Sequence, residues 1–318
     1  MLNGGMMMLK FTLKRFGYML VTLFIAASIT FMLIHAIPGD PLAGMARNLP
    51  PQIKANYYAK YGLDKPVIQQ YGLFIKNAVL HGDLGESLQY PGRSVVKTIS
   101  KYAPISARVG GQALLMGFTL GITLGITAAL NRGKWPDYVV MFIAILGISV
   151  PSFVVAALLQ YGFTVKLQWL PTTGWGSFKH TVLPSIALSF SSLATYARYM
   201  RANCLDVIGQ DYIITAKAKG VSKISLVFKH IIRNAILPAI TLLGPQIANI
   251  FIGAFVVESI FSIPGLGQYF VASVGERDYP MVMGQTIFVA ALFIISLFVV
   301  DIVYGLVDPR IRVTGKKR

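Results

Sequence analysis

Few residues in this chain have the type and spacing for covalent catalysis. Gly147-Ile148-Ser149 resembles the start of a hydrolase elbow, but the second glycine is missing and no histidine lies in a matching segment. Asp83 and Glu86 are three residues apart, yet their Gly-Asp-Leu-Gly context is typical of a loop rather than of paired carboxylates. We therefore expect no catalytic residue.

Metal, redox and nucleotide chemistry are equally poorly supported. The four histidines are scattered without ligand spacing, and the single cysteine, Cys204, excludes an internal disulfide. No Gly-x4-Gly-Lys-Ser/Thr phosphate loop occurs, and Gly133-Lys134-Trp135 does not approach one. We expect no metal and no cofactor in this chain.

The remaining candidate for a functional site is a basic polar loop between two apolar segments. Asp211–Pro238 is a polar stretch with five Lys/Arg and one Asp, placed between apolar segments. Two helical stripes are predicted there, separated by Gly220, and Ser222 is a suitable cap for the second helix. The first stripe comprises Leu205, Ile208, Tyr212 and Thr215, and the second Ile224, Phe228, Ile231 and Ala235. Such a loop either anchors the chain to lipid headgroups or docks a soluble protein.

The loop resembles the EAA coupling loop of importer-type ABC transporter membrane subunits. When the family glycine is placed at Gly220, Ile214, Thr215 and Ala216 occupy the Glu-Ala-Ala positions, so the glutamate is missing. The longer pattern, Asp-Tyr-Ile-x-Thr-Ala-x-Ala-Lys-Gly followed by Lys-His and Arg-Asn-Ala-x-Leu-Pro, is similar to that of oligopeptide and dipeptide permeases. The resemblance implies ATPase coupling by Asp211, Thr215, Ala216, Lys217, Ala218, Lys219, Gly220 and Ser222.

The composition indicates a polytopic membrane protein. Of the 318 residues 55% are hydrophobic and only 13% charged, whereas soluble domains carry about 25% charged residues. The net charge of +17 does not indicate nucleic-acid binding, because the Lys/Arg flank apolar runs. Anionic lipid and membrane orientation explain that distribution more simply.

Six membrane spans are predicted from the apolar runs. They are Phe16–Ile37, Val109–Leu130, Tyr138–Val165, Leu183–Ala202, Ile236–Val257 and Val282–Leu306. The first run is too long for a cleaved signal peptide, so we expect it to be retained. Span two carries Gly117, Gly121 and Gly125, a spacing that predicts a close-packed helix face.

Three residues within the spans are candidates for a hinge or a transport pathway. Pro151 should kink span three, with packing as the equally plausible alternative. Gln246 and Asn249 are three apart in span five and are expected on one face. Polar residues inside a membrane are functional candidates, although helix–helix hydrogen bonding is the simpler role.

The segments between spans carry further resemblance to the peptide permeases. Residues 38–104 form a polar insertion with Pro38-Gly39-Asp40-Pro41 and Gly82-Asp83-Leu84-Gly85-Glu86-Ser87, ending in a short amphipathic piece, Ser94–Tyr102, expected along the interface. Glu258–Pro280 is expected to form an outer re-entrant segment and contains Arg277-Asp278-Tyr279-Pro280.

The distribution of Lys/Arg predicts the orientation. The expected inner segments hold 17 Lys/Arg, and the two short outer loops hold three. Residues 38–108 hold nine, but long loops escape the positive-inside rule. Both termini and the 198–235 loop should therefore face the cytoplasm, and 38–104 should face outward.

The resemblance covers residues 38–312 and implies an all-α membrane protein with six transmembrane helices in the type I ABC importer permease fold. It divides the chain into 1–37, the insertion 38–104, a core 105–306 and a tail 307–318. It implies that the chain lies in the bacterial cell membrane. The implied partners are a second permease, two cytoplasmic ATPases that bind ATP and Mg²⁺, an extracytoplasmic peptide-binding protein, lipid and a peptide substrate.

Several alternatives remain open at this point. Related permeases import nickel or glutathione, and no residue of the sequence separates these cargoes. A secondary transporter would need mid-span carboxylates and internal repeats, and neither is found. A membrane scaffold would explain the spans but not the specific loop.

Overall fold

The computed structural model describes residues 2–36 and 50–307, and in these ranges the chain is built from helices without a named strand. In chain order they are α1 (Leu2–Ala36), α3 (Pro51–Tyr61), α4 (Val67–His81), α5 (Val95–Leu130), α6 (Trp135–Ser149), α7 (Ser152–Gln160), η1 (Tyr161–Lys166), α8 (Lys179–Ile208), α9 (Asp211–Ala218), α10 (Lys223–Ser225), η2 (Leu226–Ile232), α11 (Arg233–Ala235), α12 (Leu237–Thr241), α13 (Leu243–Ile260), α14 (Leu266–Gly275) and α15 (Tyr279–Val307). The Pro38–Pro41 motif and most of the 307–318 tail lie outside the described residues.

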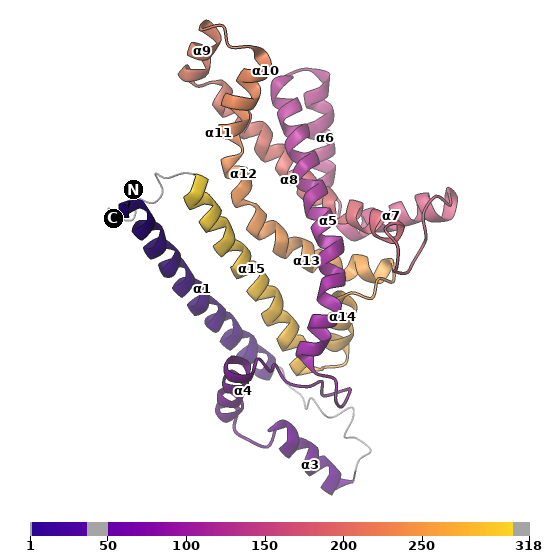
Figure 1. The fold of residues 1–318 in the computed structure, drawn as a ribbon. Coiled ribbons are helices and arrows are strands. Elements are labelled where there is room, and N and C mark those ends of the chain that lie inside the picture. The colour runs from indigo at the N-terminus through magenta and orange to yellow at the C-terminus, as the bar shows by residue number, and fades with distance from the viewer. Residues whose placement is uncertain (1, 37–49, 308–318) are drawn as a thin grey trace.

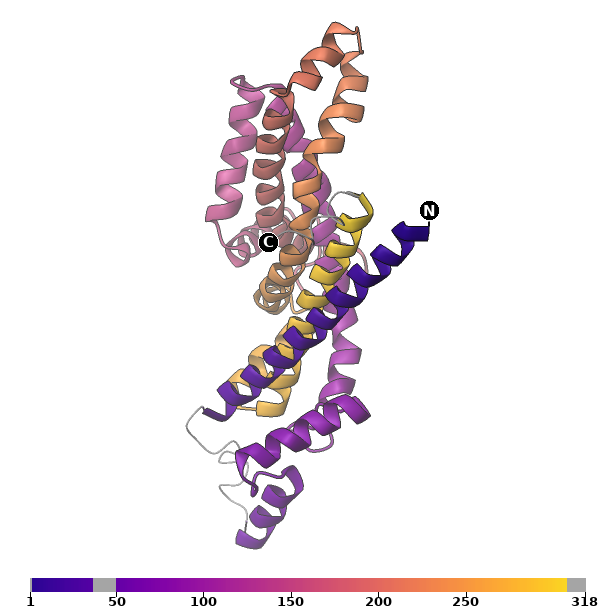
Figure 2. The same cartoon turned by 90° about the vertical axis from the view of Figure 1, so that its left-hand side faces the viewer.

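The long helices run between two ends of an elongated molecule. Figure 1 shows α9 and α10 at one end and α3 and α4 at the other. Helix α1 lies alongside α15 in both views (Figures 1 and 2), and Arg15 of α1 pairs with Asp301 of α15 at 2.9 Å. The coupling-loop segment and the insertion are therefore separated by the length of the membrane-spanning bundle.

Three described helices are long and apolar enough to cross a membrane: α1, α5 and α15. The bent pairs formed by α6 with α7–η1 and by the 223–235 segment with α12–α13 raise the number to as many as five. Helix α8 carries the predicted fourth span but is not among them. It packs against α5, α6 and α7, and buries Ser185, Ser189 and Ser192 in the interior, so its sequence does not need to match lipid.

The glycine face predicted on span two packs against α8. A Cβ at Gly121 would lie 2.6 Å from the Tyr196 Cβ, and one at Gly125 would lie 2.6 Å from the Ala197 carbonyl oxygen. A Cβ at Gly117 would collide with Ser192. Only glycine permits this approach of the two helix backbones, so the prediction of a close-packed face is confirmed.

The Ser94–Tyr102 piece, predicted to lie along the interface and lead into span two, is continuous with that span, and its position at the interface stays a prediction. Ser94 caps α5 by accepting the Lys97 N–H at 3.4 Å, and α5 then continues through Pro104 to Leu130. At about 1.5 Å per residue, the 36 residues of α5 form a helix longer than the hydrocarbon core of a membrane is thick. Val95 and Ile99 are buried, as the amphipathic pattern indicates.

Span three is not a single kinked helix. Helix α6 ends at Ser149, Pro151 precedes α7, and the two parts meet at 104°. Figure 1 shows α7 extending sideways from the bundle. Proline lacks the N–H for a helical bond and disfavours helical geometry at the residue before it, so here the helix breaks rather than bends.

Two buried carboxylates organise the corners around α14. Glu258 is fully buried and accepts the Gly267 N–H at 2.9 Å. Asp278 accepts the Leu88 N–H at 3.0 Å and a hydrogen bond from the Ser87 hydroxyl. Burial raises the pKa of Asp278, against the effect of these two donors. The two sequence motifs that contain Ser87 and Asp278 are thus joined by direct hydrogen bonds.

Candidate functional site: the coupling tip and its supports

The coupling tip, defined here as residues 211–235, begins with a tightly closed helix. Helix α9 ends in a Schellman motif, in which Val221 N–H donates to the Ala216 carbonyl at 3.2 Å and Gly220 N–H to the Lys217 carbonyl at 3.0 Å. Gly220 has φ +75°, a left-handed conformation that suits glycine. Ser222 then caps α10 by accepting the Ser225 N–H at 3.3 Å, which confirms the cap prediction.

The tip is fastened to the bundle by an apolar cluster. Its buried members are Ala129, Met200, Cys204, Ile213, Ala216, Leu226, Ile231 and Ala235. Ala216 therefore faces the chain's own interior, whereas Lys217, Ala218, Lys219 and Gly220 are exposed. Burial also raises the pKa of Cys204 to about 11, which favours the protonated thiol.

The helical stripes predicted for the loop are only partly correct. The stripe from Leu205 to Thr215 is wrong, because α8 ends at Ile208 and α9 starts at Asp211 in a new direction that exposes Tyr212 and Thr215. Ile231 and Ala235 of the second stripe are buried as predicted.

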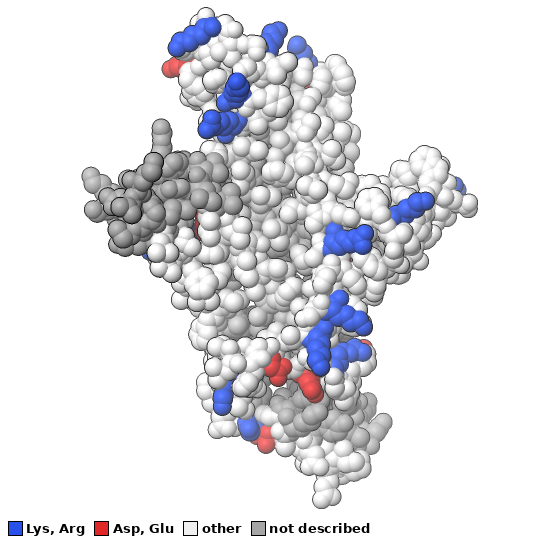
Figure 3. Space-filling model, in the orientation of Figure 1, with Lys and Arg blue, Asp and Glu red and all other residues white. Residues whose placement is uncertain are grey.

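The tip exposes large apolar side chains among lysines. Ile214 is 59%, Ile224 75% and Phe228 67% exposed. Lys217, Lys219 and Lys223 are exposed beside them, and no ion pair is formed by these lysines within the described ranges. Figure 3 shows Lys and Arg side chains gathered at this end of the molecule. Asp211 occupies the first turn of α9, where the helix dipole favours an anion.

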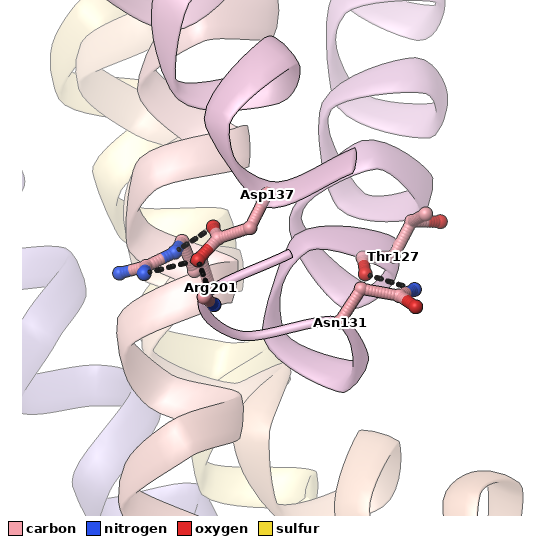
Figure 4. Close-up of polar contacts among 5 residues, drawn as sticks. Thr127, Asn131, Asp137 and Arg201 are labelled. Atoms are coloured by element: carbon pink, nitrogen blue, oxygen red, sulfur yellow. Dashed lines mark hydrogen bonds and ion pairs between the residues drawn. The ribbon is translucent and has the colours of Figure 1, made fainter. Parts of the chain in front are cut away.

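A buried ion pair supports α8 just before the tip. The Asp137 carboxylate receives Arg201 Nε at 2.5 Å and Arg201 Nη2 at 2.8 Å, a two-pronged contact that Figure 4 shows between α6 and α8. Gly133 N–H donates to the same carboxylate at 3.0 Å. Only 4% of the Asp137 side chain is exposed. Sequence reasoning missed this pair; its signal was one acidic residue directly after the basic turn 131–136.

The three pathway candidates lie in different settings. Pro151 is exposed at the break between α6 and α7, Gln246 is buried, and Asn249 is exposed. Gln246 and Asn249 lie on one side of α13 but differ in burial, so only Asn249 is turned away from the chain's own interior.

The comparisons with known proteins identify the class. Residues 121–313 match the model "Binding-protein-dependent transport system inner membrane component", and residues 8–99 match the model of the N-terminal part of such membrane components. The chain belongs to this family of transport permeases and is an integral membrane protein with the all-α fold of ABC importer permeases.

Individual relatives narrow the comparison. The chain is 42% identical over 309 residues to the dipeptide transport system permease protein DppB of Bacillus subtilis, covering 97% of this chain and 100% of that protein. It is 40% identical over 308 residues to the oligopeptide transport system permease protein OppB of Escherichia coli K12, covering 96% and 100%. The inward-facing MetNI methionine ABC transporter matches with a TM-score of 0.51 at 15% identity, over 70% of this chain and 98% of that one.

Proposed function

We propose that this chain is the membrane permease of an ATP-driven peptide importer. The relatives that match nearly its whole length carry dipeptide and oligopeptide transport in their names. The observation that carries the proposal is the coupling tip, whose apolar and basic side chains are exposed at one end of the bundle. An apolar surface of this kind is unfavourable in water and is typical of a protein-docking site.

In this proposal the tip docks into a cytoplasmic ATPase. Ile214, Ile224 and Phe228 supply the apolar contacts, and the neighbouring lysines meet acidic residues of the partner. Two such ATPases, a second related permease and an extracytoplasmic binding protein complete the assembly, with both termini in the cytoplasm and residues 38–104 outside. ATP and Mg²⁺ bind to the ATPases and not to this chain.

The tip transmits ATPase closure to the membrane helices. Movement of α9 reaches α8 through the shared apolar cluster and reaches α11 through Tyr212, whose hydroxyl accepts a hydrogen bond from Asn234 at 3.2 Å. Asn203 of α8 also donates to the Ala235 carbonyl at 3.2 Å. These links let the tip, α8 and α12–α13 move as one body and alternate the pathway between inward and outward access. Asn249, which is exposed on α13, is the side chain proposed to face that pathway.

The test is transport by the reconstituted assembly. Proteoliposomes that contain both permeases and the ATPases are supplied with loaded binding protein. They should take up a labelled dipeptide only when ATP is present on the side of the membrane that carries the ATPases. Phe228→Asp should abolish coupled uptake, whereas the buried-site control Ile231→Val should retain it. Uptake of nickel or glutathione but not of peptides would refute the peptide assignment, and ATP-independent uptake would refute the ABC mechanism.

A further inference from the structure

A small cavity lies at the end of the molecule opposite the coupling tip. It has a volume of about 220 Å³ and lies between the loop before α5, helix α14 and the start of α15. Ligand pockets for whole small molecules are about 300–1,000 Å³, so this cavity is sized for one or two residues of a peptide and not for a long chain. Its walls include Tyr90, Arg93, Tyr269 and Glu276.

Arg93 is held in this cavity by aromatic rings. Its guanidinium carbon lies 3.9 Å from the centre of the Tyr90 ring and 5.8 Å from that of Tyr269. Tyr269 is in turn stacked on Tyr102, with ring centres 4.2 Å apart. Within the described residues Arg93 forms no ion pair. A guanidinium fixed against rings, with its N–H fork unpaired by a carboxylate, is suited to bind one from a ligand.

The other wall of the cavity carries the opposite charge. Tyr90 donates its hydroxyl proton to the Glu276 carboxylate at 2.7 Å. This hydrogen bond, together with the charge of Glu276, raises the pKa of Tyr90, so its hydroxyl remains the donor at neutral pH. This hydrogen bond positions Glu276, which forms no ion pair with a cation in the part of the chain that the structure describes. Tyr90 thus separates a cation at its ring face from an anion at its hydroxyl.

We propose that this cavity is a recognition site for the free end of a short peptide, with the terminal carboxylate on Arg93 and an ammonium or amide N–H toward Glu276. The inference rests on the proposed peptide import and adds to it a site in the permease that reads charge at the end of the cargo. In the proposed orientation the site faces outward, where cargo leaves the binding protein.

The experiment uses the complete transporter in proteoliposomes. Uptake of a labelled dipeptide is compared with uptake of its C-terminal amide, each at a concentration that saturates the binding protein, so that the rates report steps after capture. The variants are Arg93→Gln and, as a matched control, Lys97→Gln, which removes a nearby exposed positive charge outside the cavity. ATPase stimulation by the loaded binding protein is recorded for every variant.

The wild type should transport the free acid about tenfold faster than the amide, equivalent to about 1.4 kcal/mol. Arg93→Gln should bring this ratio close to one without lowering the rate for the amide, and Lys97→Gln should keep the wild-type ratio. An unchanged ratio in Arg93→Gln, or a wild-type ratio of one, would overturn the site. Equal losses for both peptides would assign Arg93 to folding or to docking of the binding protein. Uptake of neither peptide by the wild type would instead refute peptide import itself and remove the proposed ligand with it.

Discussion

Replacement of Arg201 by alanine should destabilise the permease more than replacement of its partner Asp137. Arg201→Ala leaves a carboxylate that is 4% exposed and that keeps, among the described residues, only the Gly133 N–H as donor. Breaking a buried pair in this way lowers the free energy of unfolding by about 3–5 kcal/mol. Because the Arg201 side chain is 26% exposed, we expect a loss at the lower end, about 3 kcal/mol. Asp137→Ala removes the buried charge itself and should cost about 1–2 kcal/mol.

The measurement is a double-alanine cycle. Free energies of unfolding of the full chain in mixed detergent micelles are determined for the wild type, both single variants and the double variant. The double variant should be about 2 kcal/mol more stable than the sum of the single losses predicts. Arg15 and Asp301, which are 43% and 34% exposed, form the control pair and should couple by about 0–1 kcal/mol. Additive losses at Asp137 and Arg201, within about 0.5 kcal/mol, would refute the claim that this pair fastens α8 beneath the tip.

Three further predictions concern the tip, the energy source and the contact between Ser87 and Asp278. Gly220→Leu should uncouple ATP hydrolysis from peptide uptake whereas Gly220→Asn should retain coupling, because asparagine tolerates the left-handed conformation; equal uptake by both variants would contradict this. The purified single chain should show no ATP binding in a filter assay, since its sequence has no phosphate loop; saturable binding would refute the division of labour. Because burial raises the pKa of Asp278 in the folded state, its contribution to stability is complete below about pH 4 and is lost as the pH rises through that higher pKa. Between pH 4 and 7 the free energy of unfolding should therefore depend less on pH in Asp278→Asn than in the wild type. Equal pH dependence of the two proteins would contradict the raised pKa of Asp278.

Local sequence patterns predicted the features that depend on local geometry. The glycine face of α5 and the Ser222 cap follow from residue type and spacing, and both are present. Sequence patterns did not predict whether a proline would break a helix or be accommodated within it. Pro104 lies within one continuous helix, whereas Pro151 separates two helices at 104°, because packing of the surrounding helices decides which outcome prevails.

Long-range pairs were beyond single-sequence reasoning. Asp137 and Arg201 are 64 residues apart, and Ser87 and Asp278 are 191 apart, so no periodicity relates them. The tip residues were identified by resemblance rather than by physics, and their assignment to ATPase coupling is a proposal. The structure adds that Ala216 is directed inward and that the exposed apolar side chains are those of Ile214, Ile224 and Phe228.

Site-specific photocrosslinking tests the central claim, that the coupling tip docks a cytoplasmic ATPase, most directly. A photoreactive residue placed at Ile224, which is 75% exposed, should form an adduct with the ATPase in the assembled transporter. The same residue at Asn56, exposed in α3 at the other end of the molecule, should form none with the ATPase. The absence of an ATPase adduct from position 224, or an ATPase adduct from position 56, would contradict the account.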